Sequence, residues 1–170
     1  MRYENRYSRN VCTLSSEECV VVKDFRICVI GCGGLGGYVI EMLGRLGIGS
    51  ITVVDGDVFD ESNLNRQLLA TEPLLGKGKA EVAAKRMAEV NSEIEVQVIS
   101  EFLTGENANR IIAGHDLVVD ALDNISSRLI LEEACSQENI PLVHGAIAGW
   151  YGQVAIVMPG EYFLRKLYSG

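Results

Sequence analysis

Three charged side chains in this sequence stand where they could act on a phosphate. Arg66 lies in the polar run 62–67, just beyond an acid that ends an apolar segment. Lys79 stands where a helix is expected to begin, and the helix dipole disfavours a cation there unless an anion lies nearby. Asp123 follows an expected strand, at the edge where open α/β sheets bind their ligands. These positions indicate a site for a phosphate-bearing ligand.

A glycine-rich loop offers a place for such a ligand to bind. The loop consists of Gly31-Cys32-Gly33-Gly34-Leu35-Gly36, directly after an apolar run at 26–30 that is typical of a strand buried on both faces. Gly31 permits the tight turn from strand to helix, Gly33 lets backbone N–H groups approach phosphate, and Gly36 allows close packing of helix on strand. We expect the next helix to point its free N–H groups at the anion.

The segment after the loop completes a nucleotide-binding pattern. We expect the helix to end at Gly47 and to bury an apolar stripe made of Leu35, Val39, Met42, Leu43 and Leu46. A second strand at 51–55 ends in Asp55, where an acid would read a ribose hydroxyl. The glycine pattern alone is a weak signal, but this order of strand, loop, helix, strand and acid is specific. The alternative is a glycine-rich turn with an N-capping aspartate.

The remaining sequence continues to alternate strand and helix. The expected elements are an alanine-rich helix from about Lys79 to Val90, an edge strand at 94–99, a short helix at 107–113, a strand at 116–121, a helix capped by Ser126 or Ser127, and strands at 141–144 and 153–157 with a turn around Trp150. This pattern predicts an α/β fold, with a Rossmann-like, doubly wound, mainly parallel sheet and helices on both faces.

Composition and charge limit the class of protein. The chain has 170 residues, 48% of them hydrophobic, which suffices for one domain with a substantial core. Its net charge of −8 argues against broad nucleic-acid binding, and no apolar stretch could span a membrane, so we expect a cytoplasmic protein. A compact anion needs only local cations. We expect Arg6, Arg9, Arg66, Lys77 and Lys79 to form that cluster.

The cysteines and histidines do not form a metal or disulfide framework. The five cysteines are Cys12, Cys19, Cys28, Cys32 and Cys135, an odd number without a C-x-x-C pair. Cys32 has two interpretations: a thiol whose pKa is altered near bound phosphate, or a small residue that fits the turn. We expect His115 and His144 to be structural.

Six motifs occur in order along the chain. They are Arg6-Tyr7-Ser8-Arg9, G-C-G-G-L-G, D-G-D, S-N-L-N-R-Q, G-K-G-K-A-E and D-A-L-D-N. Together they resemble the ThiF/MoeB/HesA adenylyltransferases, the bacterial relatives of ubiquitin-activating enzymes, and the resemblance covers the chain up to about Val157. The resemblance implies ATP-dependent adenylation of the C-terminal carboxylate of a ubiquitin-like sulfur carrier ending in Gly-Gly, in thiamine- or molybdopterin-type sulfur transfer. It also implies ATP and Mg²⁺ as cofactors and a homodimer.

The resemblance assigns roles to individual residues. Arg66 and Lys79 would neutralise charge in the transition state, and Arg9 would reach across the dimer into the partner's site. Asp123 would hold Mg²⁺, and Asp55 would accept the ribose hydroxyls. The other nucleotide-lining residues would be Gly31, Gly33, Gly34, Gly36, Asp57, Asn63, Gln67 and Asn124.

Two of these assignments have structural alternatives. Arg66 could pair with Asp60 or Glu61 at a helix end instead of binding a ligand. Asp123 could cap the helix that follows, with Asp120 as the true acid. The D-A-L-D-N pattern favours Asp123.

The chain departs from the family pattern near its end. Many relatives carry a Cys-Tyr-Arg-Cys-like segment and a crossover-loop cysteine that 159–170 lacks, so no zinc is expected. We interpret 159–170 as a truncated tail, of either a fragment or a reduced family member. Residues 1–25 would form an N-terminal arginine segment, and 26–158 the ATP-binding domain. Lys77 lies close to Lys79, which the family pattern favours.

Two other functions remain open. A relative of this family could activate a carboxylate on a small molecule, a peptide or a modified tRNA nucleoside. An NAD-binding or non-catalytic Rossmann domain would need only the glycine loop and Asp55. An NAD-binding or non-catalytic domain would not explain why Asn63, Arg66, Lys79 and Asp123 occur together.

Overall fold

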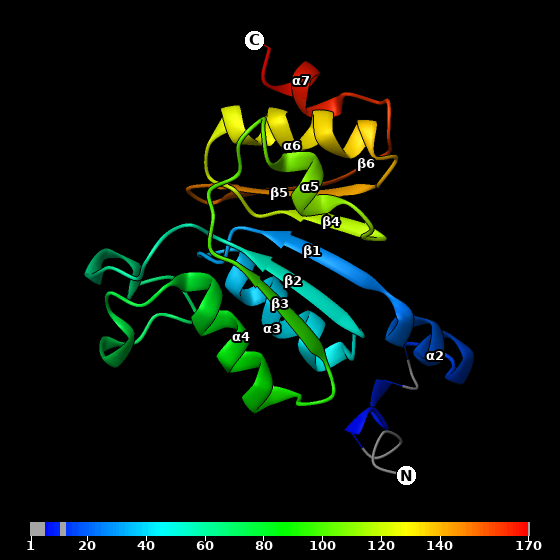
Figure 1. The fold of residues 1–170 in the computed structure, drawn as a ribbon, viewed down its shortest axis with the longest axis vertical. Helices are drawn as coiled ribbons and strands as arrows, with labels where there is room; N and C mark the ends of the chain where they lie inside the picture. The colour runs from blue at the N-terminus through cyan, green and yellow to red at the C-terminus, as the bar shows by residue number, and fades with distance from the viewer. Residues whose placement is uncertain (1–5, 11–12, 170) are drawn as a thin grey trace.

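A six-stranded sheet runs through the molecule (Figure 1). The computed structural model describes residues 6–10 and 13–169, so Cys12 and Gly170 lie outside the described residues. In spatial order the strands are β3 (Glu95–Ile99), β2 (Ser50–Val54), β1 (Arg26–Ile30), β4 (Leu117–Asp120), β5 (Leu142–Ala148) and β6 (Tyr151–Val157). Neighbouring strands from β3 to β5 are parallel, and β6 returns antiparallel to β5. The predicted Rossmann-like, mainly parallel sheet is confirmed.

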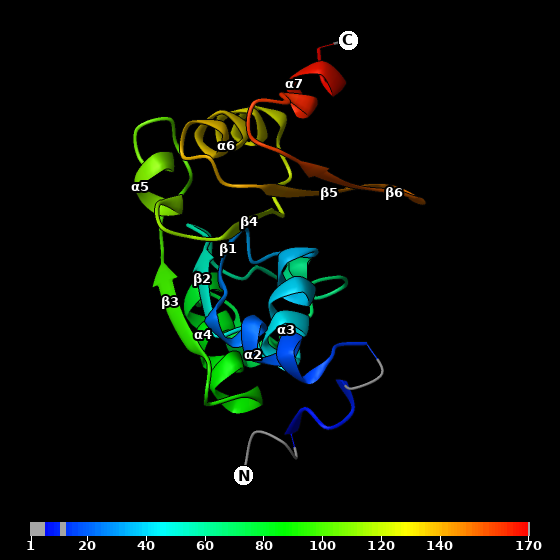
Figure 2. The same cartoon turned by 90° about the vertical axis from the view of Figure 1, so that its right-hand side faces the viewer.

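Helices cover both faces of the sheet (Figure 2). One face carries α3 (Gly36–Leu46) and α4 (Lys79–Val90), and the other carries α5 (Ala108–Ile112), α6 (Ile125–Gln137) and α7 (Phe163–Leu167). Helix α2 (Ser16–Asp24) precedes β1, and the short helices η2 (Glu61–Asn63) and η3 (Glu72–Leu74) lie between β2 and α4. In the described ranges no helix is both long and apolar enough to cross a bilayer.

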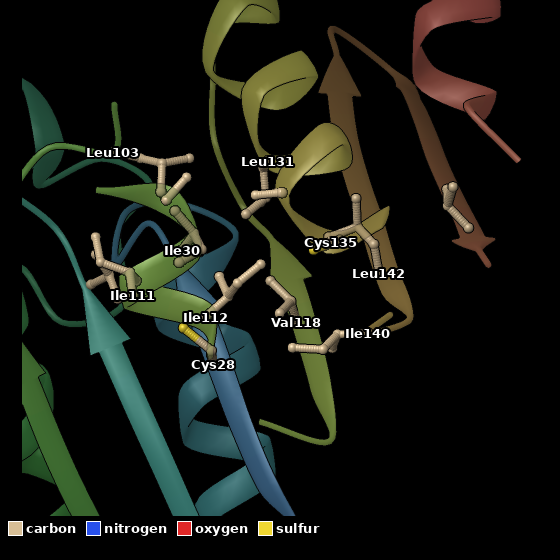
Figure 3. Close-up of a cluster of buried hydrophobic side chains, with 14 of the residues drawn as sticks. Cys28, Ile30, Leu103, Ile111, Ile112, Val118, Leu131, Cys135, Ile140 and Leu142 are labelled. Carbon is tan, nitrogen blue, oxygen red and sulfur yellow. The ribbon is translucent and has the colours of Figure 1, made fainter. Parts of the chain in front are cut away.

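The central strands are apolar throughout because successive side chains point to opposite faces and both faces are covered. On β1, Cys28 and Ile30 belong to the cluster that includes α5 and α6, whereas Ile27 and Val29 belong to the cluster with α3 and α4. Figure 3 shows the first cluster, with Leu131 of α6 directed toward the strands. This two-sided burial holds the strand ends in fixed relative positions.

Three of the five buried residues of helix α3 are glycines. Its buried positions are Gly36, Gly37, Ile40, Glu41 and Gly44. Met42 is 63% exposed, so its predicted place in a buried stripe is wrong. Glycines bring the helix close to its neighbours: a Cβ at Gly44 would lie 2.4 Å from the sulfur of Met87 on α4. The helix ends at Gly47, which adopts φ 97°, as predicted.

Two boundaries in the second half differ from expectation. Helix α6 begins at Ile125, and its N-cap is Asn124, whose Oδ1 accepts a hydrogen bond from the N–H of Ser127 (2.9 Å). The predicted caps Ser126 and Ser127 are therefore wrong. Strands β5 and β6 are longer than expected because they pair as a hairpin, and its turn includes Trp150 as predicted. Strand β3 lies at the sheet edge, also as predicted.

Candidate functional site

The glycine loop lies at the carboxyl edge of the sheet, where β1 separates β2 from β4. The strand order reverses at this point, which is where doubly wound folds bind ligands. Gly31 adopts φ 99°, and a Cβ there would lie 2.7 Å from the carbonyl oxygen of Ala121. A Cβ at Gly36 would lie 1.7 Å from the oxygen of Gly31. Both positions therefore require glycine.

Asp55 connects the glycine loop to the end of β2. Its carboxylate accepts hydrogen bonds from the N–H of Cys32 (2.8 Å) and the N–H of Asp57 (2.9 Å). Each carboxylate oxygen can accept a further hydrogen bond. Asp55 is thus positioned beside the loop and can still accept ribose hydroxyls.

The turn that carries Arg66 and Gln67 lies against the glycine loop. A Cβ at Gly33 would be 3.5 Å from Gln67 Nε2, and one at Gly34 would be 3.8 Å from Arg66 Cγ. The Gln67 side chain is buried, and its Oε1 has no hydrogen-bond partner among the described residues. An unpaired buried carboxamide is costly, so a ligand that pairs with it would remove that cost.

Arg66 itself is exposed beside this loop. Its Nη1 donates to the carbonyl of Ser62 (2.8 Å) and to Oδ1 of Asn65 (3.0 Å). Within the described ranges it forms no ion pair with Asp60 or Glu61, so the predicted structural alternative is not seen. Asp60 instead caps η2, and the hydrogen bond from the N–H of Ser62 lowers the pKa of Asp60.

Asn63 completes that cap from the other side. It is 8% exposed, and its Oδ1 accepts a hydrogen bond from the N–H of Asp60 (3.1 Å). The reciprocal cap fixes the start of the turn that leads to Arg66 and Gln67. In the ligand-free chain Asn63 therefore shapes the site, and any contact with a nucleotide stays a prediction.

Lys79 is the first residue of α4 and is 7% exposed. Its Nζ lies 2.9 Å from Asp57 Oδ2. Its charge also acts on Cys32: burial and then the charge of Asp55 raise the pKa of that thiol, and Lys79 opposes them. The ammonium group pairs with Asp57, whose N–H donates to Asp55, the residue that holds Cys32 of the glycine loop. Lys77, in contrast, is exposed. Because the net pKa shift of Cys32 is upward, the thiol stays protonated, which supports its reading as a small turn residue.

Asp120 and Asp123 have different environments at the end of β4. Asp120 is fully buried; it faces Nδ1 of His144 at 2.7 Å and accepts a hydrogen bond from the N–H of Leu122 (3.0 Å). Asp123 is exposed and makes no hydrogen bond or ion pair in the part of the chain that the structure describes. Since Asn124 caps α6, Asp123 is neither the cap nor a structural acid, and it is free to meet a ligand.

The N-terminal arginines do not join the other cations. The ring of Tyr7 lies against Gly47, where a Cβ would be 2.6 Å away, and Arg6 donates to Asn91, the C-cap of α4. This anchoring is at the ends of α3 and α4 opposite to the glycine loop, about 16 Å away for an 11-residue helix. The prediction that Arg6 joins Arg66 and Lys79 in one cluster is therefore wrong, and the role of Arg9 in a partner's site stays a prediction.

Arg128 is a residue near the site that was not predicted from the sequence. This residue is 8% exposed, and its Nε donates to the carbonyl of Leu122 (3.1 Å), next to Asp123. The sequence feature that could have indicated Arg128 is the presence of an arginine inside a largely apolar helix. The histidines have structural partners, as predicted: His144 pairs with a buried carboxylate, and His115 Nε2 lies 2.7 Å from Thr52 Oγ1.

A glycine loop at a reversal of strand order, with the turn that carries Arg66 beside it, is the arrangement of a nucleotide-binding α/β domain. The chain belongs to the ThiF family, and the family model matches residues 7–169. The resemblance seen in the motifs is therefore confirmed.

Individual relatives agree with this membership. The chain is 38% identical over 166 residues to a SAMP-activating enzyme E1 of Haloferax volcanii, covering 96% of this chain and 62% of that protein. It is 40% identical over 142 residues to a sulfur carrier protein ThiS adenylyltransferase of Bacillus subtilis, covering 82% and 42%. Among solved structures, the Escherichia coli tRNA N6-threonylcarbamoyladenosine dehydratase in complex with ATP has a TM-score of 0.83 at 34% identity, covering 87% and 62%. The chain thus spans less than two thirds of each.

Proposed function

We propose that this chain uses ATP to adenylate the C-terminal glycine carboxylate of a small ubiquitin-like sulfur-carrier protein. The observation that carries the proposal is the contact of the Arg66–Gln67 turn with the glycine loop. A redox dinucleotide such as NAD would bind through the loop and Asp55, and its binding would not require a cation such as Arg66 beside the loop. The carrier is inferred from relatives named for SAMP and ThiS.

The reaction sets the electrostatic demands on the site. A carboxylate oxygen of the carrier attacks the α-phosphorus of ATP, the bond from that phosphorus to the oxygen bridging to the β-phosphate breaks, and pyrophosphate leaves. Because an anion approaches an anion, the site must neutralise developing charge. Arg66 and Lys79 would do so beside the loop, and Asp55 would hold the ribose. No general base is required, since the attacking carboxylate is already ionised.

The residues fit a magnesium ion that is bound mainly through ATP. Mg²⁺ typically takes one or two carboxylates together with substrate phosphates and water. Asp123 is an exposed carboxylate without another partner in the described ranges, and those ranges contain no cluster of three or more metal-binding side chains. Asp123 would therefore hold the ion against the phosphates. The ion would supply further neutralisation of phosphate charge.

We also propose that the active form is a homodimer in which Arg9 of one copy serves the other copy's site. Arg9 is exposed and lies at the far end of α3 from the loop of its own chain. An exposed apolar face on the β5–β6 hairpin supports a partner: Ile147, Val154 and Ile156 share one side and are each more than two-thirds exposed.

Carrier-dependent exchange of labelled pyrophosphate into ATP tests the proposed activity. Purified ubiquitin-like proteins ending in Gly-Gly should support exchange, whereas a peptide carboxylate or a threonylcarbamoyl-modified tRNA should not. Arg66→Ala and Asp123→Ala should abolish it. Arg110→Ala is the matched control, because Arg110 is an exposed arginine on α5 that pairs with Glu101. Exchange retained in both site variants would refute the assignment of the site.

A further inference from the structure

Hydrogen bonds to two buried side chains hold the N–H and C=O groups of Leu122, directly before Asp123 and Asn124. Arg128 donates to the Leu122 carbonyl through Nε (3.1 Å) and also through Nη2. The Leu122 N–H donates to Asp120 Oδ1 (3.0 Å). Since Arg128 and Asp120 are both buried, the start of this loop cannot shift without breaking hydrogen bonds to two buried charged side chains.

Tyr168 joins the two groups that hold Leu122. Its hydroxyl accepts a hydrogen bond from Arg128 Nη1 (2.8 Å) and lies 3.3 Å from Nε2 of the fully buried His144. On the other side of that ring, Nδ1 lies 2.7 Å from Asp120 Oδ2. A carboxylate can only accept, so Nδ1 carries a proton, and in the neutral imidazole Nε2 then accepts from the Tyr168 hydroxyl. Four side chains thus form one continuous hydrogen-bonded chain.

Helix α7 places Tyr168 in that chain. Helix α7 lies beside α6 (Figure 1). The carboxylate of Glu132, 2% exposed, accepts hydrogen bonds from the N–H groups of Leu164 (2.5 Å) and Arg165 (3.0 Å) at the start of α7. Leu164 is fully buried in the core cluster that also contains Leu131 of α6. Tyr168 follows Leu164 by one helical turn, so it faces the same side of the molecule.

We propose that Tyr168 is a positioning residue of the nucleotide site. Through Arg128 and His144 it fixes the Leu122 peptide, and thereby the loop 121–124, in the conformation that binds Mg·ATP. This rests on the proposed function, which assigns that loop to the nucleotide. The C-terminal segment then has a role in the site, although it touches no nucleotide itself.

Tyr168→Phe in the full chain tests the proposal, because it removes one hydroxyl and leaves the ring. Tyr162→Phe is the matched control: its hydroxyl lies in the same segment and accepts from Ser136 Oγ (3.3 Å), outside the network. The readouts are hydrogen exchange of the Leu122 amide by NMR, Mg·ATP affinity by calorimetry, and global unfolding by urea. Tyr168→Phe removes two hydrogen bonds that act on the loop only through Arg128 and His144. It should therefore speed Leu122 exchange and weaken Mg·ATP binding by about three- to tenfold, part of the full cost of those bonds.

The control should change both quantities by less than about twofold, and comparable urea unfolding of the two variants would exclude a global effect. Unchanged Leu122 exchange in Tyr168→Phe, or an equal change in Tyr162→Phe, overturns the proposal. If the wild-type chain binds no Mg·ATP, the proposed function fails and the nucleotide part of this proposal fails with it. Leu122 exchange would then still decide whether Tyr168 fixes the loop.

Discussion

Lys79 Nζ and Asp57 Oδ2 lie 2.9 Å apart, and the two side chains differ sharply in exposure, at 8% for the lysine and 57% for the aspartate. The cation is therefore buried, while its partner is reached by water. If Lys79 paired with a phosphate instead, the Asp57 carboxylate would remain hydrated. The free-energy cost of exchanging one partner for the other is therefore small. In the ligand-free chain, Asp57 thus keeps the Lys79 ammonium group in position for a ligand.

Substitutions of Asp57 and Lys79 should separate the contribution of the ion pair to stability from the contribution of Lys79 to ATP binding. Asp57→Asn leaves a buried cation with a weaker partner, so we expect it to lower the free energy of unfolding by about 1–2 kcal/mol. ATP should still raise the melting temperature of Asp57→Asn, because Lys79 remains. Lys79→Met should lose that ATP-dependent rise. Differential scanning fluorimetry with and without Mg·ATP measures both effects, and an ATP response kept by Lys79→Met would contradict the role of Lys79.

Gly36→Ala should be poorly tolerated. A Cβ at this position would lie 1.7 Å from the backbone oxygen of Gly31, so helix and loop must separate. We expect a loss of more than about 3 kcal/mol in the free energy of unfolding. Gly105→Ala is the control, because a Cβ there meets nothing within 4 Å, and it should change stability by less than about 0.5 kcal/mol. Equal urea midpoints for the two variants would disprove the close contact.

Glu41 provides a pH-dependent test of the packing of α3 on α4. Hydrogen bonds from Arg86, and less strongly from Arg45, lower the pKa of Glu41 below its ordinary value of 4.5. A lowered folded pKa means that the stabilisation is complete above about pH 4.5 and is lost as the pH falls through the folded pKa. Glu41→Gln should therefore cost about 1–3 kcal/mol at neutral pH and progressively less in acid. Urea unfolding across this range measures it, with the exposed Glu106→Gln as control; a cost that is constant with pH would contradict the prediction.

Complementation between two inactive variants tests the shared site. Arg9→Ala and Arg66→Ala should each abolish carrier-dependent exchange in a homodimer. In a mixed dimer one of the two sites combines an intact Arg66 with the intact Arg9 of the other copy. Random mixing should therefore restore about one quarter of the sites. If the mixture stays as inactive as either variant alone, under conditions where subunits exchange, Arg9 does not act across the dimer.

The strand order and the glycine loop could be predicted from sequence because their physics is local. Apolar β-branched runs must be buried on both faces, and Gly31 and Gly36 stand where no side chain fits. The stripe on α3 could not be predicted in the same way. Apolar spacing identifies Met42, but the buried face includes Gly36, Gly37 and Gly44, which pack against the glycine loop, Leu69 and Met87.

The features of the site that depend on contacts between residues far apart in the sequence could not be predicted from local patterns. Asp55, Lys79 and Asp123 were recognisable from their places at strand and helix ends. The separation of Arg6 from Lys79 was not, because it depends on which end of α3 the N-terminal segment packs against. The link from Tyr168 to the loop after β4 joins residues more than 40 positions apart, so no local pattern indicates it.

The most direct test of the central claim is a calorimetric titration of this chain with Mg·ATP and, separately, with NAD, repeated for Arg66→Ala and for the control Arg110→Ala. If the loop, Arg66 and Lys79 form an ATP site, the wild type and Arg110→Ala bind Mg·ATP far more tightly than NAD, and Arg66→Ala loses most of that preference. Tighter binding of NAD, or Mg·ATP binding that is indifferent to Arg66, would contradict the account.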